Sequence, residues 1–143
     1  MNLYINTTNG ESIFIAVTEN HKILLQKIIK AKYKQSERVL TEIDKLLTKV
    51  KDIYNLFSKK QNLISNIVIV NGPGPFTATR IGVTVGNTLA YAWQVPVVGI
   101  KNSEFKDNYE LINKAEKKLL KVKKNNIVEP FYNQAPSITV SKK

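Results

Sequence analysis

The feature that most constrains the fold is an unbroken apolar run at residues 67–70, Ile-Val-Ile-Val. A strand that is apolar on both faces is typical of the buried interior of a parallel sheet. A rigid loop rich in glycine and proline follows at 71–76, and a helix is expected over 77–93. A further strand is predicted at 95–100, with Pro96 near its start, where proline is tolerated. The chain therefore contains a strand–helix–strand unit, whose crossover should be right-handed.

Three more strands are predicted before this unit, at residues 2–7, 11–18 and 22–30. They are rich in β-branched and aromatic residues, and Asn9-Gly10 is a strong turn signal between the first two. These three strands should form an antiparallel meander.

A long amphipathic helix is predicted over residues 36–58, because its apolar residues recur at intervals of three and four. The apolar arc of this helix is wider than packing against one sheet requires. Either a wide core face or a second packing partner explains the excess width.

A third helix is predicted over residues 104–124, with Ser103 as its N-cap. The complete order, βββαβαβα, is the pattern of a ribonuclease-H-like or actin-like (ASKHA) lobe. We therefore predict an α/β fold with a mixed five-stranded sheet, the first strand beside the fourth, and helices on both faces. This single lobe should cover residues 1–126, and a C-terminal tail should follow at 127–143.

The composition excludes several kinds of active site. The 143 residues include no cysteine, which excludes disulfides, thiol nucleophiles and cysteine-bound zinc. The single histidine, His21, excludes a histidine cluster and leaves little room for Ser-His-Asp chemistry. No apolar run approaches the roughly 18–20 residues of a membrane helix, and the N-terminus does not resemble a secretory signal. We expect a cytoplasmic protein with no membrane partner.

The chain is strongly basic, with 22 Lys and Arg against 11 Asp and Glu and a formal net charge of +11. Such an excess suggests an acidic partner such as nucleic acid. However, 20 of the 22 are lysines, and Lys, Asn and Ile all have A/T-rich codons, so genome base composition is a competing explanation. Specific phosphate and base recognition also favours Arg. The densest basic cluster consists of Lys114, Lys117, Lys118, Lys121, Lys123 and Lys124.

Glycine is unusually placed in the second predicted helix and in the loop before it. The loop matches neither the dinucleotide fingerprint nor the P-loop pattern. Pro73 and Pro75 also lack the backbone N–H groups that a phosphate cradle would use. In the helix, Gly82, Gly86 and Ala90 lie four residues apart on one face. Because a helical glycine costs about 1 kcal/mol relative to alanine, we expect another backbone to approach this face, from either the same chain or a partner.

This glycine-rich segment belongs to a longer motif that resembles the bacterial TsaB (YeaZ) family, the dimerization subunit for tRNA threonylcarbamoyladenosine synthesis. The family's hallmark is the run G-P-G-S-F-T-G-L-R-I-G, followed by a small-residue helix and a strand similar to P-V-V-G-V. The first strand, the segment 36–40 and the segment 129–136 also resemble family segments. The matching motif residues are Gly72, Pro73, Gly74, Phe76, Thr77, Arg80, Ile81, Gly82, Leu89, Ala90, Pro96, Val97, Val98 and Gly99.

The sequence departs from the family pattern at several positions. Asn6 stands where the family has Asp, and Gln35 stands where it has His. Three motif residues that are Ser, Gly and Leu in the family are replaced, and these replacements are Pro75, Ala78 and Thr79.

The resemblance covers residues 1–102 and about 129–140, and we expect a shortened member that lacks the second actin-like lobe usual in the family. Actin-like folds bind ATP between two lobes. A single lobe with a neutral Asn6 implies a subunit without catalytic residues, metal or cofactor of its own.

The resemblance implies a non-catalytic scaffold that supports a TsaD-type threonylcarbamoyltransferase, a complex that a TsaE-type ATPase commonly joins. Helices 36–58 and 77–93 would pack against the matching helix pair of a TsaD homologue, or of a second copy when the chain is alone. The residues expected to bind this partner are Glu37, Leu40, Ile43, Leu47, Arg80, Gly82, Gly86 and Ala90.

The lysine-rich third helix is expected to assist tRNA binding within the complex. The residues expected to contact nucleic acid are Lys117, Lys118, Lys121 and Lys124. Two other functions are the alternatives: a basic RNA-binding module that acts on its own, and a degenerate enzyme of the glycopeptidase class.

Overall fold

The computed structural model describes residues 1–55 and 62–132, and its five strands form one mixed sheet in the order β3-β2-β1-β4-β5. β1 pairs antiparallel with β2 and parallel with β4, so the first strand lies beside the fourth as predicted. The antiparallel meander and the parallel β4–β5 pair are likewise confirmed. The strands are β1 (Asn2–Asn6), β2 (Ser12–Glu19), β3 (Lys22–Lys30), β4 (Asn66–Val70) and β5 (Val97–Ile100).

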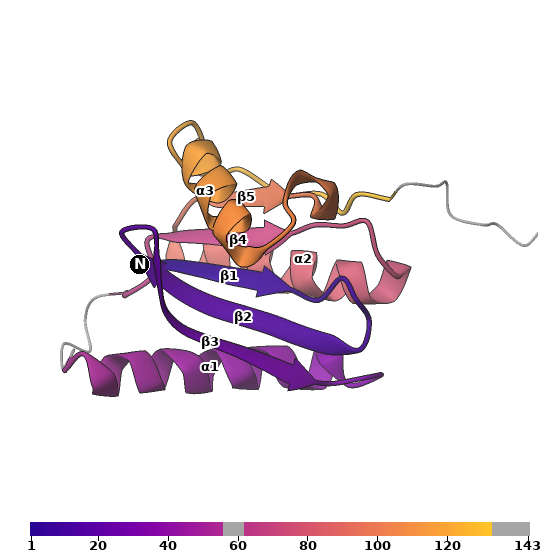
Figure 1. Ribbon diagram of the computed structural model, residues 1–143, viewed down its shortest axis with the longest axis horizontal. Coiled ribbons are helices and arrows are strands. Elements are labelled where there is room, and N and C mark those ends of the chain that lie inside the picture. The colour runs from indigo at the N-terminus through magenta and orange to yellow at the C-terminus, as the bar shows by residue number, and fades with distance from the viewer. Residues whose placement is uncertain (56–61, 133–143) are drawn as a thin grey trace, which may run out of the picture.

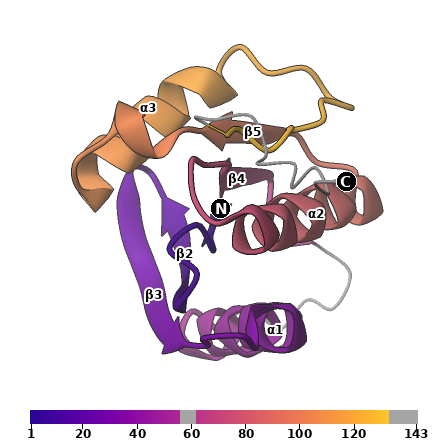
Figure 2. The same cartoon turned by 90° about the vertical axis from the view of Figure 1, so that its right-hand side faces the viewer.

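Helices cover both faces of the sheet, as predicted (Figures 1 and 2). α1 (Gln35–Ile53) and α2 (Phe76–Trp93) lie side by side on one face, and α3 (Asn108–Leu119) lies on the other. Alternate residues of the central strands therefore enter two separate cores. Ile67 and Ile69 of β4 pack under α1 and α2, whereas Val68 packs under α3.

The predicted third helix is wrong at both ends. Ser103 lies in a short 3-10 turn (Asn102–Glu104) instead of capping a helix. Asp107 is the actual N-cap of α3, because its side chain accepts a hydrogen bond of 2.8 Å from the N–H of Glu110. α3 ends at Leu119, five residues before the predicted end at 124.

The predicted first helix, by contrast, begins within one residue of the observed start at Gln35. Its observed end is Ile53, and the last three residues of the predicted range, 56–58, lie outside the described residues.

α2 approaches the sheet closely because the hydroxyl of Thr7, just after β1, is inserted into the helix backbone. Thr7 Oγ1 donates to the carbonyl of Ala78 at 2.5 Å and accepts from the N–H of Gly82 at 3.1 Å. A Cβ at Gly82 would lie 2.5 Å from this hydroxyl oxygen. At Gly86, a Cβ would overlap the buried side chain of Ile69.

Gly82, Gly86 and Ala90 are therefore buried against the chain's own sheet. The prediction that these three residues line a partner interface is wrong. The approach that the glycine spacing indicated is made by Thr7 and Ile69 of the same chain.

A buried carboxylate fastens α1 to β3. Glu42 has only 3% of its side chain exposed and accepts from Lys27 at 2.7 Å and from Arg38 at 3.1 Å. Arg38 also donates to the carbonyl of Lys30 at 2.9 Å, so one guanidinium bridges helix and strand. The hydrogen bond from Lys27 is the main reason why the pKa of Glu42 lies below its ordinary value, although burial by itself would raise it.

Gly86→Leu should destabilise the isolated chain, because the new side chain would displace Ile69 from the core. Overpacking of this kind typically costs about 1–3 kcal/mol, and a difference of that size lowers Tm by several degrees. Thermal unfolding followed by circular dichroism measures the change. Thr88→Leu, at an exposed position of the same helix, is the control and should leave Tm nearly unchanged. Equal melting temperatures for the two variants would contradict the burial of Gly86.

Glu42→Gln should lower the free energy of unfolding at pH 7, because Lys27 and Arg38 lose their carboxylate. The pKa of Glu42 is lower in the folded chain than the ordinary 4.5. Its contribution is therefore present above that pH and is lost as the pH falls through the folded value. Urea unfolding at several pH values should show the difference from wild type shrinking below about pH 4.5.

Asp44→Asn, at an exposed carboxylate on the same helix, is the control for this measurement and should change the free energy of unfolding little. If Glu42→Gln lowered the free energy of unfolding by the same amount at every pH, the ion pair would not act as described.

Candidate interaction surfaces

The outer side of the α1–α2 pair keeps four of the eight residues predicted to bind a partner. Glu37, Leu40 and Arg80 are exposed, and Leu47 is half-buried. Leu40 has 53% of its surface exposed, so it is free to contact a partner. Ile43, by contrast, is 2% exposed and belongs to the core, so its predicted role at the interface is wrong.

Two hollows lie along the seam between these helices. The first, of about 340 Å³, is lined by Ser36 of α1 and by Phe76, Arg80 and Ile81 of α2, among others. The second, of about 350 Å³, lies near the opposite ends of the helices. It is lined by Asp44, Leu47, Thr48, Lys51, Asn62, Leu63 and Trp93. Side chains of a second helix pair could enter such hollows as ridges enter grooves.

Sequence reasoning missed Phe76 as a surface residue at this seam. Its ring is 47% exposed, stacks on Tyr132 with centroids 5.1 Å apart, and lies 5.0 Å from the guanidinium carbon of Arg80. These contacts hold Arg80 beside the first hollow, where it presents a planar cation to solvent.

The carboxyl ends of β1, β4 and β5 are joined by a neutral polar network. Asn6 Oδ1 accepts from the N–H of Thr8 at 2.9 Å and from its hydroxyl at 2.7 Å. Asn102 donates to the Thr8 hydroxyl at 3.0 Å and to the Pro73 carbonyl at 2.7 Å. The amide of Asn6 thus orders the loop after β1. Across residues 1–55 and 62–132, no group of three or more His, Asp or Glu side chains could hold a metal ion.

The four lysines predicted to contact nucleic acid differ in their surroundings. Lys118 lies 2.9 Å from the carboxylate of Glu104 and donates to the carbonyl of Gly99 at 3.1 Å, so it fastens α3 to β5. Burial alone would raise the pKa of Glu104, but hydrogen bonds from Lys118 and from the backbone N–H of Lys101 outweigh it, and the pKa is lowered. Lys118 therefore serves the fold, whereas Lys117, Lys121 and Lys124 are exposed.

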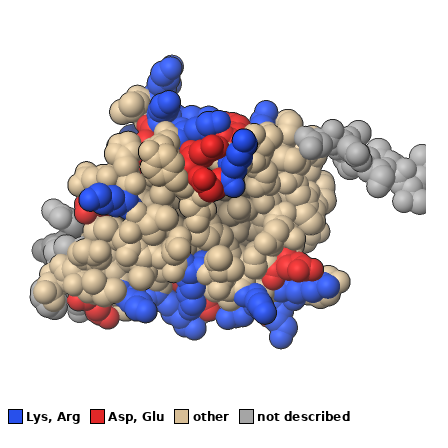
Figure 3. Space-filling view, viewed as in Figure 1, with Lys and Arg blue, Asp and Glu red and all other residues tan. Residues whose placement is uncertain are grey.

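Figure 3 shows basic side chains gathered over α3 at the top of the molecule and along α1 at the bottom. Between them, the uncovered part of the sheet presents mostly uncharged atoms. None of the helices that the structure describes is long and apolar enough to cross a bilayer.

The described part of the predicted tail, residues 127–132, packs on the lobe. The Asn87 side chain bonds both backbone groups of Val128, at 2.8 and 2.9 Å, and Val128 is 6% exposed. The N–H of Phe131 donates to the carbonyl of Asn71 at 2.8 Å. The lobe boundary at 126 remains a prediction, and residues 133–143, with part of the C-terminal motif, lie outside the described residues.

Comparison with known proteins gives consistent relatives. Residues 30–118 match the family model of TsaD, tRNA N6-adenosine threonylcarbamoyltransferase. Over 102 residues the chain is 29% identical to the tRNA threonylcarbamoyladenosine biosynthesis protein TsaB of Bacillus subtilis. That alignment covers 71% of this chain and 41% of the relative.

Among solved structures, YeaZ from Pseudomonas aeruginosa matches with a TM-score of 0.58 and 24% identity over 70% of this chain and 43% of its own. A second structure is described as an uncharacterized protein with similarity to peptidase YeaZ from Pseudomonas aeruginosa. It matches with a TM-score of 0.55 and 24% sequence identity, over 70% of this chain and 42% of its own. These likenesses confirm the actin-like α/β fold. The chain spans about two fifths of the length of these relatives.

Proposed function

We propose that the chain, which belongs to the protein family described by the TsaD model and is similar to TsaB (YeaZ) proteins, acts in tRNA threonylcarbamoyladenosine (t6A) modification as a non-catalytic scaffold. In this proposal it supports a TsaD-type enzyme, and a TsaE-type ATPase is a further expected component. The enzyme, and not this chain, transfers the threonylcarbamoyl group to tRNA.

The observation that carries this proposal is the exposed outer side of α1 and α2. Arg80 and Leu47 each line one of the two hollows there, and Leu40 is exposed on α1, although the helices already bury an apolar face on the sheet. In this proposal the exposed Leu40 and the half-buried Leu47 face the partner, whereas Val39 and Leu46 of the same apolar arc belong to the chain's own core. A matching helix pair from the enzyme is the proposed occupant, and a second copy of this chain would use the same side in its absence.

A scaffold role is supported by the chemistry at the carboxyl ends of the parallel strands. A carboxylate after β1 would organise a metal-bound phosphate, but Asn6 is neutral and its oxygen is engaged by Thr8. The loop after β4 contributes Pro73 and Pro75, which have no N–H to donate to an anion.

Coexpression of the full chain with the TsaD homologue of the same genome, followed by size-exclusion chromatography, tests the proposal directly. A stable complex containing both chains supports the scaffold function. Absence of a complex at micromolar concentrations, with both proteins folded, would overturn it and favour the glycopeptidase-like or independent RNA-binding alternatives.

Leu40→Lys should weaken the complex at least tenfold, because a charged group would be desolvated at the interface, and each tenfold corresponds to about 1.4 kcal/mol. The free chain should keep its Tm, since Leu40 is 53% exposed. Affinity is measured by biolayer interferometry against the immobilised enzyme. Leu120→Lys, the same substitution at an exposed leucine after α3, is the control. Equal affinities for both variants would show that the outer side of α1 is not the interface.

The isolated chain should neither bind ATP tightly nor hydrolyse it. This expectation follows from the neutral Asn6 and from the two prolines in the loop after β4. Isothermal titration calorimetry with Mg-ATP should show no saturable heat. Micromolar affinity would contradict a purely scaffolding role.

A further inference from the structure

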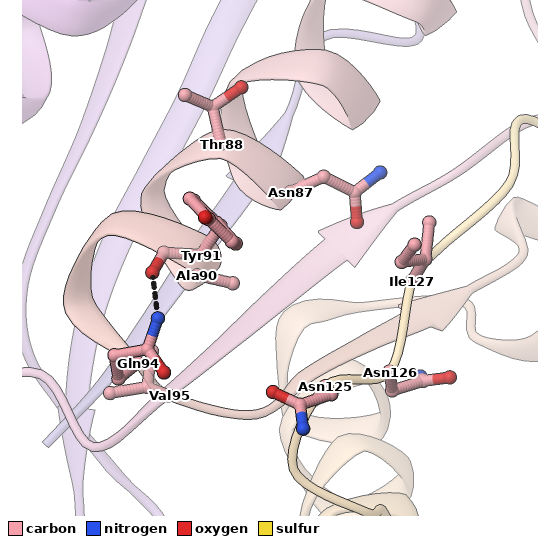
Figure 4. Close-up of a pocket in the computed structure, with 9 residues that line it drawn as sticks. All are labelled: Asn87, Thr88, Ala90, Tyr91, Gln94, Val95, Asn125, Asn126 and Ile127. Atoms are coloured by element: carbon pink, nitrogen blue, oxygen red, sulfur yellow. Dashed lines mark hydrogen bonds between the residues drawn. The ribbon is translucent and has the colours of Figure 1, made fainter.

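A hollow outside the α1–α2 seam lies where the end of α2 faces the segment after α3. Its volume is about 520 Å³, within the range of sites that enclose one small ligand. Figure 4 shows Asn87, Tyr91 and Gln94 on one wall and Asn125, Asn126 and Ile127 on the other. Tyr91 is 80% exposed and Ile127 is 73% exposed, so the rim carries two large apolar groups in contact with water.

The walls of this hollow are held in place by hydrogen bonds. Asn87 is fixed by its two bonds to Val128, and the Gln94 side chain donates to the Tyr91 carbonyl at 2.7 Å. Asn126 donates through its side chain to the carbonyl of Val97 at 2.8 Å, which leaves its amide oxygen as an acceptor. The exposed Tyr91 ring therefore lies beside amide side chains that are themselves held by hydrogen bonds.

A second hollow, of about 670 Å³, shares Asn125 and Asn126 with the first as lining residues. Its remaining wall includes Lys121, Lys123 and Lys124. No Asp or Glu lines either hollow. Within the described parts of the chain, none of these three lysines has a carboxylate within 4.0 Å, and the lysines that do have one are Lys27, Lys32, Lys45 and Lys118.

These two hollows together form what we call the tyrosine–lysine surface: Tyr91, Gln94, Lys121, Lys123, Lys124, Asn125 and Asn126. It combines an exposed aromatic ring, amide side chains and uncompensated cations. Single-stranded nucleic acid has the matching groups, because unstacked bases lie on aromatic rings, base edges bond amides, and phosphates bind lysine. An acidic peptide would satisfy the lysines and could bond the amides, but its carboxylate side chains have no planar base to stack on the exposed ring.

We propose that the tyrosine–lysine surface binds single-stranded RNA, with one base stacked on Tyr91 and the flanking phosphates on Lys121, Lys123 and Lys124. The binding itself does not depend on the proposed function; only its natural source, a single-stranded loop of tRNA, rests on it. The surface lies on the flank of α2 that faces Asn125–Ile127, whereas Ile81 and Val85 line the hollow at the α1 seam. RNA and a protein partner could therefore bind at the same time.

Fluorescence anisotropy of the full chain with a labelled single-stranded oligoadenylate of about 12 nucleotides tests this proposal. Tyr91→Ala should weaken binding about tenfold through loss of stacking, whereas Tyr91→Phe should bind like wild type. Tyr109→Ala, which removes another exposed tyrosine (75%) on α3, should have no effect. Unchanged affinity of Tyr91→Ala, or equal losses for the alanine and phenylalanine variants, would overturn the stacking assignment.

The lysines are tested by a triple change, Lys121→Gln, Lys123→Gln and Lys124→Gln. The steepness of the slope of log affinity against log salt concentration should fall by about 2, because each phosphate contact with a single strand contributes about 0.7 to that slope. The matched control is the triple glutamine variant of Lys22, Lys30 and Lys49, which are exposed on β3 and α1. Equal effects of the two triple variants would show unspecific charge attraction and would overturn the proposal.

Two competitors complete the test. Duplex RNA of the same length should compete poorly, because its bases are not free to stack on Tyr91, and polyglutamate should compete poorly because it has no bases. Equal competition by either would overturn the proposal. If the chain forms no complex with the TsaD homologue, the scaffold function fails but the RNA-binding proposal still stands. If the complex forms normally and Tyr91→Ala binds RNA like wild type, the RNA-binding proposal fails but the scaffold function still stands.

Discussion

The hydroxyl of Thr7 is the contact on which the arrangement of both candidate surfaces depends. It occupies a place in the hydrogen-bond ladder of α2, between the carbonyl of Ala78 and the N–H of Gly82. This geometry requires a residue without a Cβ at position 82 and fixes which face of α2 is turned toward the sheet. Once that face is set, one flank of α2 lines the seam with α1, and the other lines the hollow beside Asn125–Ile127.

Much of the fold could be predicted from local patterns, because strand order and helix placement follow from the apolar run at 67–70 and from the spacing of apolar residues. The orientation of α2 could not. The glycine spacing indicates that something approaches Gly82 and Gly86, but the groups that do so, Thr7 and Ile69, come from other elements of the chain. Thr7 and Gly82 are 75 positions apart, and no pattern within the helix identifies such a neighbour.

The same limit explains the errors at the candidate sites. Ile43 and Leu40 belong to one apolar pattern, yet one is buried and the other exposed, because the position of β2 and β3 decides how much of the arc is covered. Lys118 looks like its neighbours in sequence, but Glu104 neutralises it. Tyr91, to which we assign RNA stacking, lies at helical spacing from Asn87 and Gln94, but polar residues at this spacing are typical of any exposed helix face and do not mark a site.

Base composition leaves unexplained where the lysines lie rather than how many lack a carboxylate partner. A genome rich in A and T supplies lysine codons everywhere, and among the described lysines those within 4.0 Å of a carboxylate are Lys27, Lys32, Lys45 and Lys118. Codon bias gives no reason for three uncompensated lysines to line one acid-free hollow, next to an exposed tyrosine and four amide side chains. Mutual repulsion makes such a cluster unfavourable in the free protein. In the proposed complex a polyanionic ligand would relieve that repulsion, and the aromatic and amide groups beside it would select among polyanions the one that carries bases.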